Sequence, residues 1–314
     1  MQKSVWLKEH TTYKIGGPAA YFVEVKDVRD IEKAVSEWKS IGGDVRDIFI
    51  LGGGANVLLP DSGFSGLILK ISIAGIDLTE KGLIEAGAGT LLKDIVEFAA
   101  DKELSGMEWA AGLPGSFAGA IRGNAGAFGG EMKDVIIEVK SVELSSPDKI
   151  IIRRNKDCEF DYRTSRYKKE GGEVIISAIV KLSPGEEKNI RDRMDEYVKY
   201  REDHQPLEYP SAGSTFKNID VKYITSKQKK EWATVIKNDP FPVVPVAFLL
   251  SEAGLKGKRI GGAVISEKHP NFFINYDNAT ADDVKKLISL AQKEVKNKFN
   301  IDIEPEIQII DREI

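Results

Sequence analysis

The spacing of apolar residues along the chain predicts short strands that alternate with amphipathic helices. Apolar residues recur at helical spacing from Val28 to Trp38, and Asp27 before them is a typical N-terminal cap. Further helices are expected over 90–104, with Thr90 as the cap, and over 186–201, 247–253 and 280–299. Apolar runs between turn residues predict strands over 21–25, 47–51, 67–71, 84–89, 135–144, 150–153, 174–182, 271–275 and 301–310.

These elements divide into three units. The first, 1–72, combines strands and one helix in a small α/β layer, and the second covers 73–205. The third, 206–314, begins where Pro206 and Pro210 interrupt the pattern. A chain of 314 residues is long enough for two or three domains with separate cores. The expected fold class is therefore α+β with three domains.

The segment 111–131, AGLPGSFAGAIRGNAGAFGGE, has seven glycines among its 21 residues. Because glycine loses much conformational freedom on folding, this density requires a reason. Phe117, Ile121 and Phe128 provide packing anchors and argue against disorder, while Arg122 and the lack of a long apolar run exclude a membrane helix. Two interpretations remain: a backbone that approaches a large flat ligand, and a close helix–strand crossing without a ligand.

A second glycine cluster, GGGAN at 52–56, directly follows the apolar run 47–51. A strand that ends in successive glycines can present its backbone N–H groups as an anion-binding nest. Neither G-x-G-x-x-G nor G-x-x-x-x-G-K-[ST] occurs in the chain, which disfavours a Rossmann site and a P-loop. The two clusters together suggest one extended phosphate-bearing ligand that lies across both.

Composition excludes several other classes of protein. The formal net charge of −4 provides no basic field for nucleic acid. A single cysteine, Cys158, excludes an intrachain disulfide and is typical of a reducing compartment. The three histidines lie far apart, so no metal site is expected. The polar N-terminus lacks the apolar core of a signal peptide, and a cytoplasmic protein without membrane insertion is expected.

Seven motifs give the chain a resemblance to a known family. They are HTTYKIGGPA (10–19), ILGGGANVLLPDSGFSGLIL (50–69), GMEWAAGLPGSFAGAIRGNAGAFGGEMKDV (106–135), FDYRTSRYK (160–168), PSAGSTFKN (210–218), GLKGKRIGGAVISEKHPNFFIN (254–275) and EPEIQII (304–310). In this order and spacing, the chain resembles the UDP-N-acetylenolpyruvoylglucosamine reductases (UDP-N-acetylmuramate dehydrogenases), the flavoenzymes of peptidoglycan precursor synthesis. The resemblance covers nearly the whole chain.

The resemblance implies a fold and a reaction. The first two units would form an FAD-binding unit of the PCMH/vanillyl-alcohol-oxidase type, and the third an α/β substrate-binding domain. The implied activity is reduction of UDP-N-acetylenolpyruvoylglucosamine to UDP-N-acetylmuramate, with FAD as cofactor and NADPH as reductant. The implied partner is a small UDP-sugar enolpyruvyl ether. We expect a monomer, although no motif reports oligomeric state or the choice between NADPH and NADH.

Arg163, Ser214 and Glu306 occupy the family's catalytic motif positions. Taken alone, Arg163 would be a solvated charge and Ser214 a turn residue. Glu306 would lie on the solvent-exposed face of an edge strand. The resemblance implies that Arg163 and Glu306 stabilise charge on the substrate as hydride arrives, and that Ser214 gives a proton to the α-carbon. Glu304 is the alternative to Glu306, and Lys217 is a candidate neighbour of Ser214.

The remaining site residues are also implied by the resemblance. Those for FAD lie in the 15–17 turn and in the two glycine clusters: Ile15, Gly16, Gly17, Gly52, Gly53, Gly54, Ala55, Asn56, Gly112, Gly115, Ser116, Gly119, Ala120, Gly123, Asn124 and Gly126. Those for the substrate are Tyr162, Lys217, Asn218 and Lys256. Lys256 belongs to a basic loop, 254–259, that would bind the diphosphate, although such a charge run is usually only solvated.

The chain departs from the family pattern at two places. A charged segment at about 219–240 is inserted after Asn218, where it could reshape the mouth of the substrate site. In addition, only 50 residues separate Arg163 from Ser214. This spacing resembles a shorter subtype that lacks the tyrosine-bearing loop that closes over the substrate, so the means of shielding the site from water is open.

Two competing functions stay open at this point. One is a sugar or alcohol oxidase or dehydrogenase on the same flavin-binding fold. Such enzymes often attach the flavin through His or Cys, and neither residue occurs in the glycine stretches. The other is a flavin-binding protein without catalysis, against which the presence of Arg163, Ser214 and Glu306 argues.

Overall fold

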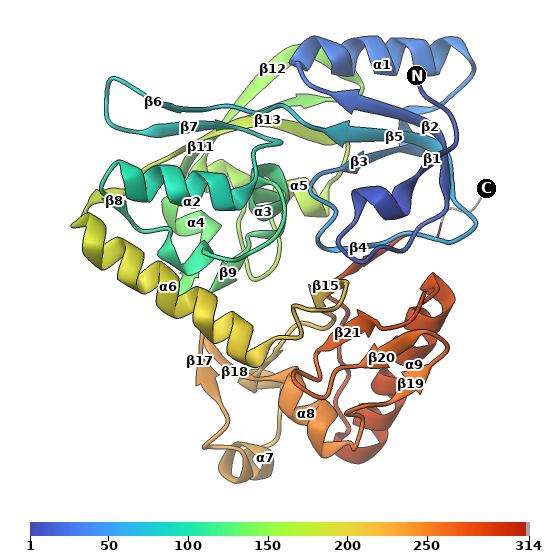
Figure 1. Ribbon diagram of the computed structural model, residues 1–314, viewed down its shortest axis with the longest axis vertical. Coiled ribbons are helices and arrows are strands. Elements are labelled where there is room, and N and C mark those ends of the chain that lie inside the picture. The colour runs from blue at the N-terminus through green and yellow to red at the C-terminus, as the bar shows by residue number, and fades with distance from the viewer. Residues whose placement is uncertain (312–314) are drawn as a thin grey trace.

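The computed structural model describes residues 1–311. The last three residues of the predicted third unit, 312–314, lie outside the described residues. Figure 1 shows two sheets across the upper part of the molecule, with α2, α3 and α6 beneath them and the third unit at the bottom.

The first sheet has the strand order β1-β2-β5-β3, and β2, β5 and β3 are parallel. Its elements are β1 (Val5–Trp6), a 3-10 turn (Leu7–His10), β2 (Pro18–Val25), α1 (Val28–Ser40), a 3-10 turn (Val45–Asp47), β3 (Ile48–Leu51), β4 (Val57–Leu58) and β5 (Phe64–Ile71). The predicted helix is confirmed, and Asp27 caps it in a capping box with Asp30. Because α1 provides the crossover between parallel strands, β3 ends next to β5 and delivers the chain directly into the glycine cluster at 52–54.

The second sheet is antiparallel, with the order β12-β11-β13-β7-β6. Its strands are β6 (Ile76–Leu78), β7 (Ile84–Gly87), β11 (Ile136–Glu143), β12 (Ser146–Arg154) and β13 (Glu173–Val180). The helices of this part are α2 (Leu92–Asp101), α3 (Phe117–Gly123), α4 (Met132–Val135), α5 (Arg166–Lys169) and α6 (Glu187–His204), with 3-10 turns at Glu108–Ala110 and Asn155–Cys158. Two small ladders complete it, β8 (Leu104–Ser105) with β14 (Ser183–Pro184) and β9 (Gly126–Ala127) with β10 (Gly130–Glu131).

The predicted limits of α2 are wrong at both ends. Leu91, not Thr90, is the N-cap, because the Thr90 hydroxyl donates instead to the carbonyl of Gly75 at 3.1 Å. The helix stops at Asp101, and Glu103 then adopts a left-handed conformation with φ 55°. A tertiary hydrogen bond and a backbone reversal therefore set limits that apolar spacing does not report.

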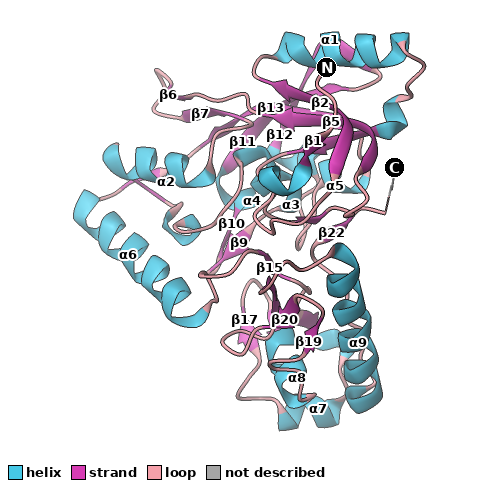
Figure 2. Cartoon of the chain, turned by 45° about the vertical axis from the view of Figure 1, so that its right-hand side comes forward, coloured by secondary structure: helices cyan, strands magenta, loops and turns pink. Residues whose placement is uncertain are grey.

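The third unit is built on the antiparallel sheet β15-β21-β20-β19. Its elements are β15 (Ser211–Ser214), α8 (Val246–Glu252), β19 (Arg259–Ile260), β20 (Ala263–Ile265), β21 (Phe272–Asn275) and α9 (Ala281–Phe299). Figure 2 shows α9 along one side of this unit. The predicted Thr280–Asp283 capping box is confirmed at the start of α9.

The inserted segment has a structure of its own. It contains β16 (Ile219–Asp220), a 3-10 turn (Val221–Tyr223), α7 (Ser226–Glu231), β17 (Lys237–Asn238) and β18 (Pro242–Val244). The strands form a three-stranded antiparallel sheet in the order β16-β18-β17.

The predicted strand over 301–310 is wrong for most of its length. Only β22 (Gln308–Ile309) is a strand, and it pairs in parallel with β4 of the first unit. Before that point, the Lys217 N–H donates to the Glu304 carbonyl at 3.0 Å and the Glu306 N–H to the Thr215 carbonyl at 2.7 Å. The segment therefore changes partners midway, and Figure 1 shows it rising from the third unit to the first.

The apolar cores follow this arrangement. One core contains side chains from both of the first two predicted units, for example Leu69 and Ile95, so their division at 72/73 stays a prediction. A second core fills the third unit, and it also receives Tyr13, Ile15 and Leu58 from the first. The third unit is thus packed against the first through apolar side chains as well as through β22.

We expect Asn271→Ala to lower the free energy of unfolding by about 2–4 kcal/mol, because two buried backbone groups would lose their partner. The Asn271 side chain is buried, accepts from the Phe216 N–H at 3.0 Å and donates to the Phe216 carbonyl at 2.8 Å. Urea unfolding measures the change. Asn189→Ala, an exposed control on α6, should change stability by less than about 0.5 kcal/mol. Equal stability of both variants would contradict the structural role of Asn271.

Candidate active site

The two glycine clusters meet in space. The Gly53 N–H donates to the Ser116 hydroxyl at 3.0 Å, and a Cβ atom at Gly53 would lie 2.5 Å from the Gly115 Cα. Any side chain at Gly53 would therefore drive the two segments apart. The expectation that the two clusters form one surface is consistent with this contact, because they adjoin along their backbones.

The face of α3 next to this contact is open. Ser116 is the N-cap of α3, and its hydroxyl accepts from the Gly119 N–H at 3.4 Å. A Cβ at Gly123 would meet no described protein atom within 4 Å, and one at Gly119 would meet only the Ser116 hydroxyl, at 3.4 Å. Packing within the described chain therefore does not require these two glycines. Their absence of side chains instead leaves room beside the helix for a bound group.

Other glycines of the predicted FAD set are required by the protein itself. A Cβ atom added at Gly17 would lie 2.1 Å from the carbonyl oxygen of Asp61. One added at Gly54 would lie 2.1 Å from the carbonyl oxygen of His10. Ile15 lies in the core of the third unit. At Gly17, Gly54 and Ile15, packing within the protein is enough to explain the residue type, without a ligand.

The fully buried Asn124 also has a clear structural role. Its amide donates to the Asp161 carbonyl at 3.0 Å, and its side-chain oxygen accepts from the Lys133 N–H at 2.9 Å. Any contact of Asn124 with a cofactor would therefore come from its backbone. The side chain holds the loop that carries Arg163 against the end of α3.

The remaining members of the set are distributed around the same surface. Ala55 lies against Gly115, and Ala120 is buried on α3. The Asn56 amide donates to the Glu306 carbonyl at 3.3 Å, and Gly52 and Gly112 lie beside Ser116 and Arg201 respectively. Gly126 lies against Arg163, because its carbonyl accepts from Arg163 Nη2 at 2.8 Å.

Arg163 and Glu306, 143 residues apart in sequence, form an ion pair with Nε and Oε1 separated by 3.0 Å. Arg163 has φ 54°, a left-handed conformation, and its carbonyl accepts from Lys168 Nζ at 2.9 Å. Its Nη1 atom is buried and has no hydrogen-bond partner among the described residues. A buried guanidinium N–H without a partner is costly, so its presence indicates a binding position for an acceptor such as a carboxylate.

Glu306, rather than Glu304, faces this guanidinium. Burial raises the pKa of Glu306, and the positive charges of Arg163, Lys168 and Lys217 partly oppose that rise. Glu304 instead pairs with Lys217 at 2.5 Å, and 71% of its side chain is exposed. The two carboxyl groups, separated by one residue, therefore have different environments, and only Glu306 is placed to share a proton inside the site.

Ser214 lies at the end of β15, next to Thr215, whose carbonyl accepts from the Glu306 N–H. Its hydroxyl has no hydrogen-bond partner within the described chain, and Gly213 before it has φ 73°, where an added Cβ would meet no described atom within 4 Å. The predicted neighbour Lys217 pairs with Glu304 rather than with Ser214. The backbone thus brings Ser214 beside the Arg163–Glu306 pair with a free hydroxyl.

The predicted substrate residues lie in two groups. Tyr162 accepts a hydrogen bond from the Asn218 N–H at 3.3 Å, and the Arg163 guanidinium lies 5.1 Å from the Tyr162 ring centroid. Lys256 follows α8 and is exposed, with no ion pair among the described residues. Burial first, and then charges that include Lys256, lower the pKa of His269 to about 4. Lys256 therefore lies in the same basic region as the turn that precedes β21.

Two further buried basic residues, Lys168 and Arg122, were not among the residues predicted from the sequence. Burial, and then the charge of Lys217, lower the pKa of Lys168, and burial lowers the pKa of Arg122. Both lie in the motifs that carry the resemblance, and Lys168 is five residues after Arg163. Their type and position are visible in the sequence, but their burial, and the position of Lys168 near Glu306, required the tertiary structure.

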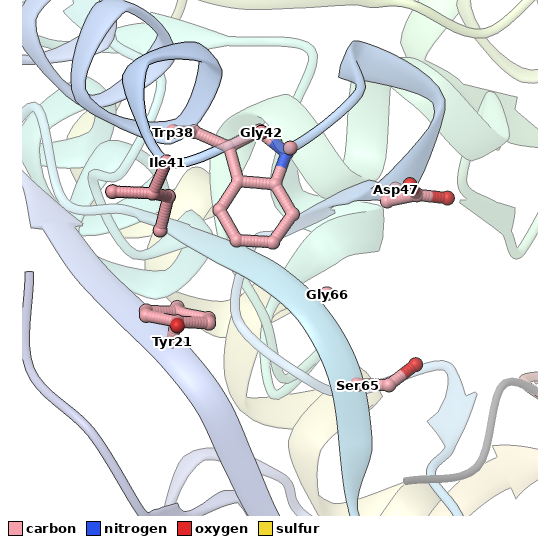
Figure 3. A pocket seen from close by; sticks show the side chains of 8 residues that line it. Tyr21, Trp38, Ile41, Gly42, Asp47, Ser65 and Gly66 are labelled. Atoms are coloured by element: carbon pink, nitrogen blue, oxygen red, sulfur yellow. The ribbon is translucent and has the colours of Figure 1, made fainter.

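Other candidate sites on the described chain are weaker. No group of His, Cys, Asp and Glu side chains in residues 1–311 could hold a metal ion, and no helix there could span a membrane. A hollow in the first unit is lined by Tyr21, Trp38 and Ile41 on one side and by Asp47 and Ser65 on the other (Figure 3). It does not include any residue of the Arg163–Glu306 site.

Known proteins match the chain along its length. The family model of the UDP-N-acetylenolpyruvoylglucosamine reductase C-terminal domain matches residues 205–310. The family model of an FAD binding domain matches residues 19–146. The UDP-N-acetylenolpyruvoylglucosamine reductase of Clostridium tetani is 37% identical over 304 residues, which are 97% of this chain and 90% of that protein. The Clostridium perfringens reductase is 38% identical over 307 residues, 98% of this chain and 92% of that protein.

The chain belongs to the UDP-N-acetylenolpyruvoylglucosamine reductase family. These are flavin oxidoreductases of peptidoglycan precursor synthesis. The crystal structure of the Thermus caldophilus reductase has a TM-score of 0.75 to this chain at 28% identity and covers 98% of each chain. In the present chain, the part that matches the FAD-binding domain, 19–146, includes both glycine clusters. The open face of α3 fits a flat cofactor.

We expect this reductase to hold FAD without a covalent bond, because no Cys or His lies in the two glycine clusters. Denaturation of the purified yellow protein should release all its flavin into the supernatant, as absorbance measures. Flavin that precipitates with the chain would contradict this prediction. So would a protein that takes up no flavin after reconstitution.

Proposed function

We propose that the chain reduces UDP-N-acetylenolpyruvoylglucosamine to UDP-N-acetylmuramate with NADPH. The observation that carries the proposal is the pairing of Arg163 with a Glu306 of raised pKa, which leaves the buried Nη1 of Arg163 without a partner. The free Ser214 hydroxyl lies on the adjacent backbone segment. Bound flavin supplies the hydride that the β-carbon of the enol ether receives.

Arg163 and Glu306 act on the charge that this transfer creates. Negative charge develops at the α-carbon and spreads onto the substrate carboxylate. Arg163 Nη1 donates to that carboxylate, where a charge-assisted bond in a desolvated site is strongest as the charge grows. A protonated Glu306 donates to the same enolate oxygen, and its raised pKa favours the protonated form that this requires.

Ser214 completes the reaction by giving its proton to the α-carbon. The resulting CH–CH₃ unit balances one hydride and one proton added across the C=C bond. The alkoxide that remains on Ser214 then takes a proton from solvent. The three residues thus divide charge stabilisation from proton transfer.

Binding of the rest of the substrate follows from charge. The chain has a net charge of −4, so a diphosphate needs local cations. Lys256 is an exposed cation on a short turn, and Tyr162, next to Arg163 in sequence, accepts from the Asn218 N–H. NADPH rather than NADH, a monomeric state and a cytoplasmic location stay predictions from the sequence.

The same observation weighs against the alternatives. A sugar or alcohol oxidase must take hydride from its substrate and gains nothing from a guanidinium aimed at a carboxylate. A flavin-binding protein without catalysis has no need for a buried Arg163 Nη1 that lacks a partner.

For Lys256→Ala, we expect KM for the UDP-sugar to rise about tenfold, because the lost contact is to a diphosphate. FAD content should not change, since Lys256 lies in the third unit. Steady-state kinetics and flavin absorbance measure both quantities. An unchanged KM would show that Lys256 is only a solvated surface charge.

Ser214→Ala separates the two half-reactions. NADPH should bleach the flavin of the variant at a near-normal rate, because that step needs no protein acid. Reoxidation by substrate should slow by at least about a hundredfold, since a positioned general acid contributes about 10²–10⁴-fold. Anaerobic stopped-flow absorbance follows both steps.

Two outcomes of that experiment would remove Ser214 from the mechanism. Equal slowing of both half-reactions would mean that the flavin is misplaced. Normal reoxidation would mean that Glu306 or a water molecule supplies the proton.

A further inference from the structure

The inserted segment at about 219–240 and the residues that follow it, through β18 at 242–244, form an ordered part of the third unit. Trp232 is 9% exposed, and its ring makes edge contacts with Phe248 on α8 and Phe299 on α9, at centroid distances of 5.7 and 5.6 Å. The Gln228 amide adds a hydrogen bond to the Phe299 carbonyl at 3.0 Å. These contacts with α8 and α9 hold the segment that carries the small sheet β16-β18-β17 in a defined position.

The turn of this sheet between β17 and β18 reaches the FAD-binding part of the molecule at two points. Asp239 Oδ1 accepts from the Gly129 N–H at 3.2 Å, at the end of the glycine stretch. The Phe241 ring meets the Tyr162 ring edge to face, with centroids 5.0 Å apart and planes at 73°. The insertion therefore bridges the two sides of the site rather than extending into solvent.

The Phe241–Tyr162 contact lies next to Arg163. Tyr162 precedes Arg163 in sequence, and its ring lies 5.1 Å from the Arg163 guanidinium carbon. Its hydroxyl accepts from the Asn218 N–H, so the ring is fixed at both its hydroxyl end and its Phe241 contact. A continuous series of contacts thus runs from Phe241 through Tyr162 and Arg163 to Glu306.

We propose that Phe241 is a positioning residue for Arg163 in the second half-reaction. It holds the Tyr162 ring, and that ring keeps the Arg163 guanidinium oriented so that Nη1 meets the substrate carboxylate. The Asp239–Gly129 hydrogen bond keeps the turn closed against the FAD-binding part. This inference rests on the proposed function, and it gives the insertion a role in the chemistry rather than in folding alone.

The contact requires an aromatic ring at this position. Edge-to-face pairs and cation–π pairs depend on the charge distribution of the ring, and burial of apolar area alone does not replace them. The chain offers a control in the insertion, Tyr223, which is 71% exposed and whose ring has a cation–π contact with Lys222. Loss of an aromatic ring can therefore be compared at two positions a short distance apart.

The experiment compares the complete flavin-loaded protein with Phe241→Ala, Phe241→Tyr and Tyr223→Ala. For Phe241→Ala we expect flavin reduction by NADPH at the normal rate and reoxidation by substrate about three- to tenfold slower. Equilibrium binding of substrate to the oxidised protein, measured by calorimetry without turnover, should weaken by a similar factor. Phe241→Tyr should restore both quantities, and Tyr223→Ala should change neither.

The outcomes separate this inference from the proposed function. If substrate does not reoxidise the flavin of the unchanged chain, the proposed function is wrong. If it does, and Phe241→Ala behaves like the unchanged chain, only the positioning role is overturned. Equal slowing of both half-reactions also overturns it, because it shows a general opening of the site.

Three further variants keep the test decisive. If Phe241→Ala loses flavin, Phe241→Leu takes its place, because leucine conserves much of the volume but provides no ring. Asp239→Ala should slow reoxidation in the same selective way, and Asp239→Asn, which keeps an acceptor for the Gly129 N–H, should not. Failure of tyrosine to restore the rate lost in Phe241→Leu would overturn the proposal.

Discussion

The change of partner in the C-terminal segment is the constraint on which the site depends. Residues 304–306 bond to 215–217 within the third unit, and β22 then pairs with β4 beside the first glycine cluster. The segment around Glu306 is hydrogen-bonded to the third unit before it and to the first unit after it. A shift of Glu306 would therefore break hydrogen bonds to both units. Its pairing with Arg163, which comes from the second unit, therefore fixes the relative position of all three parts.

The electrostatics of the site follow from this convergence. A carboxyl group taken out of water binds its proton more tightly, and neighbouring cations oppose that effect. At Glu306 burial is the larger influence, so its pKa is raised even with Arg163 at 3.0 Å. Arg163 in turn has Glu306, the Gly126 carbonyl and the Tyr162 ring around it, and one N–H without a protein partner. In the proposed function, the substrate carboxylate accepts from this N–H.

The glycines of the predicted FAD-binding set have two different physical causes. At Gly17 and Gly54, a side chain would collide with backbone of the same protein, so glycine is required for folding. At Gly123, a side chain would meet nothing in the described chain, so folding does not require glycine there. Both kinds look alike in the sequence, because composition reports only that a Cβ is missing. The reason for each absence depends on what lies opposite in space.

The sequence by itself determined the local elements and the family. Apolar spacing correctly placed α1 and α9, and the ordered motifs identified the reductase family. Only the tertiary structure decided the limits of α2, the irregular path of 301–310 and the different partners of Glu304 and Glu306. It also decided that Asp239 of the insertion and Phe241 just after it contact Gly129 and Tyr162. The physical reason is that helices and capping boxes arise from residues three or four apart, whereas a site made by segments more than a hundred residues apart is set by packing that no local pattern contains.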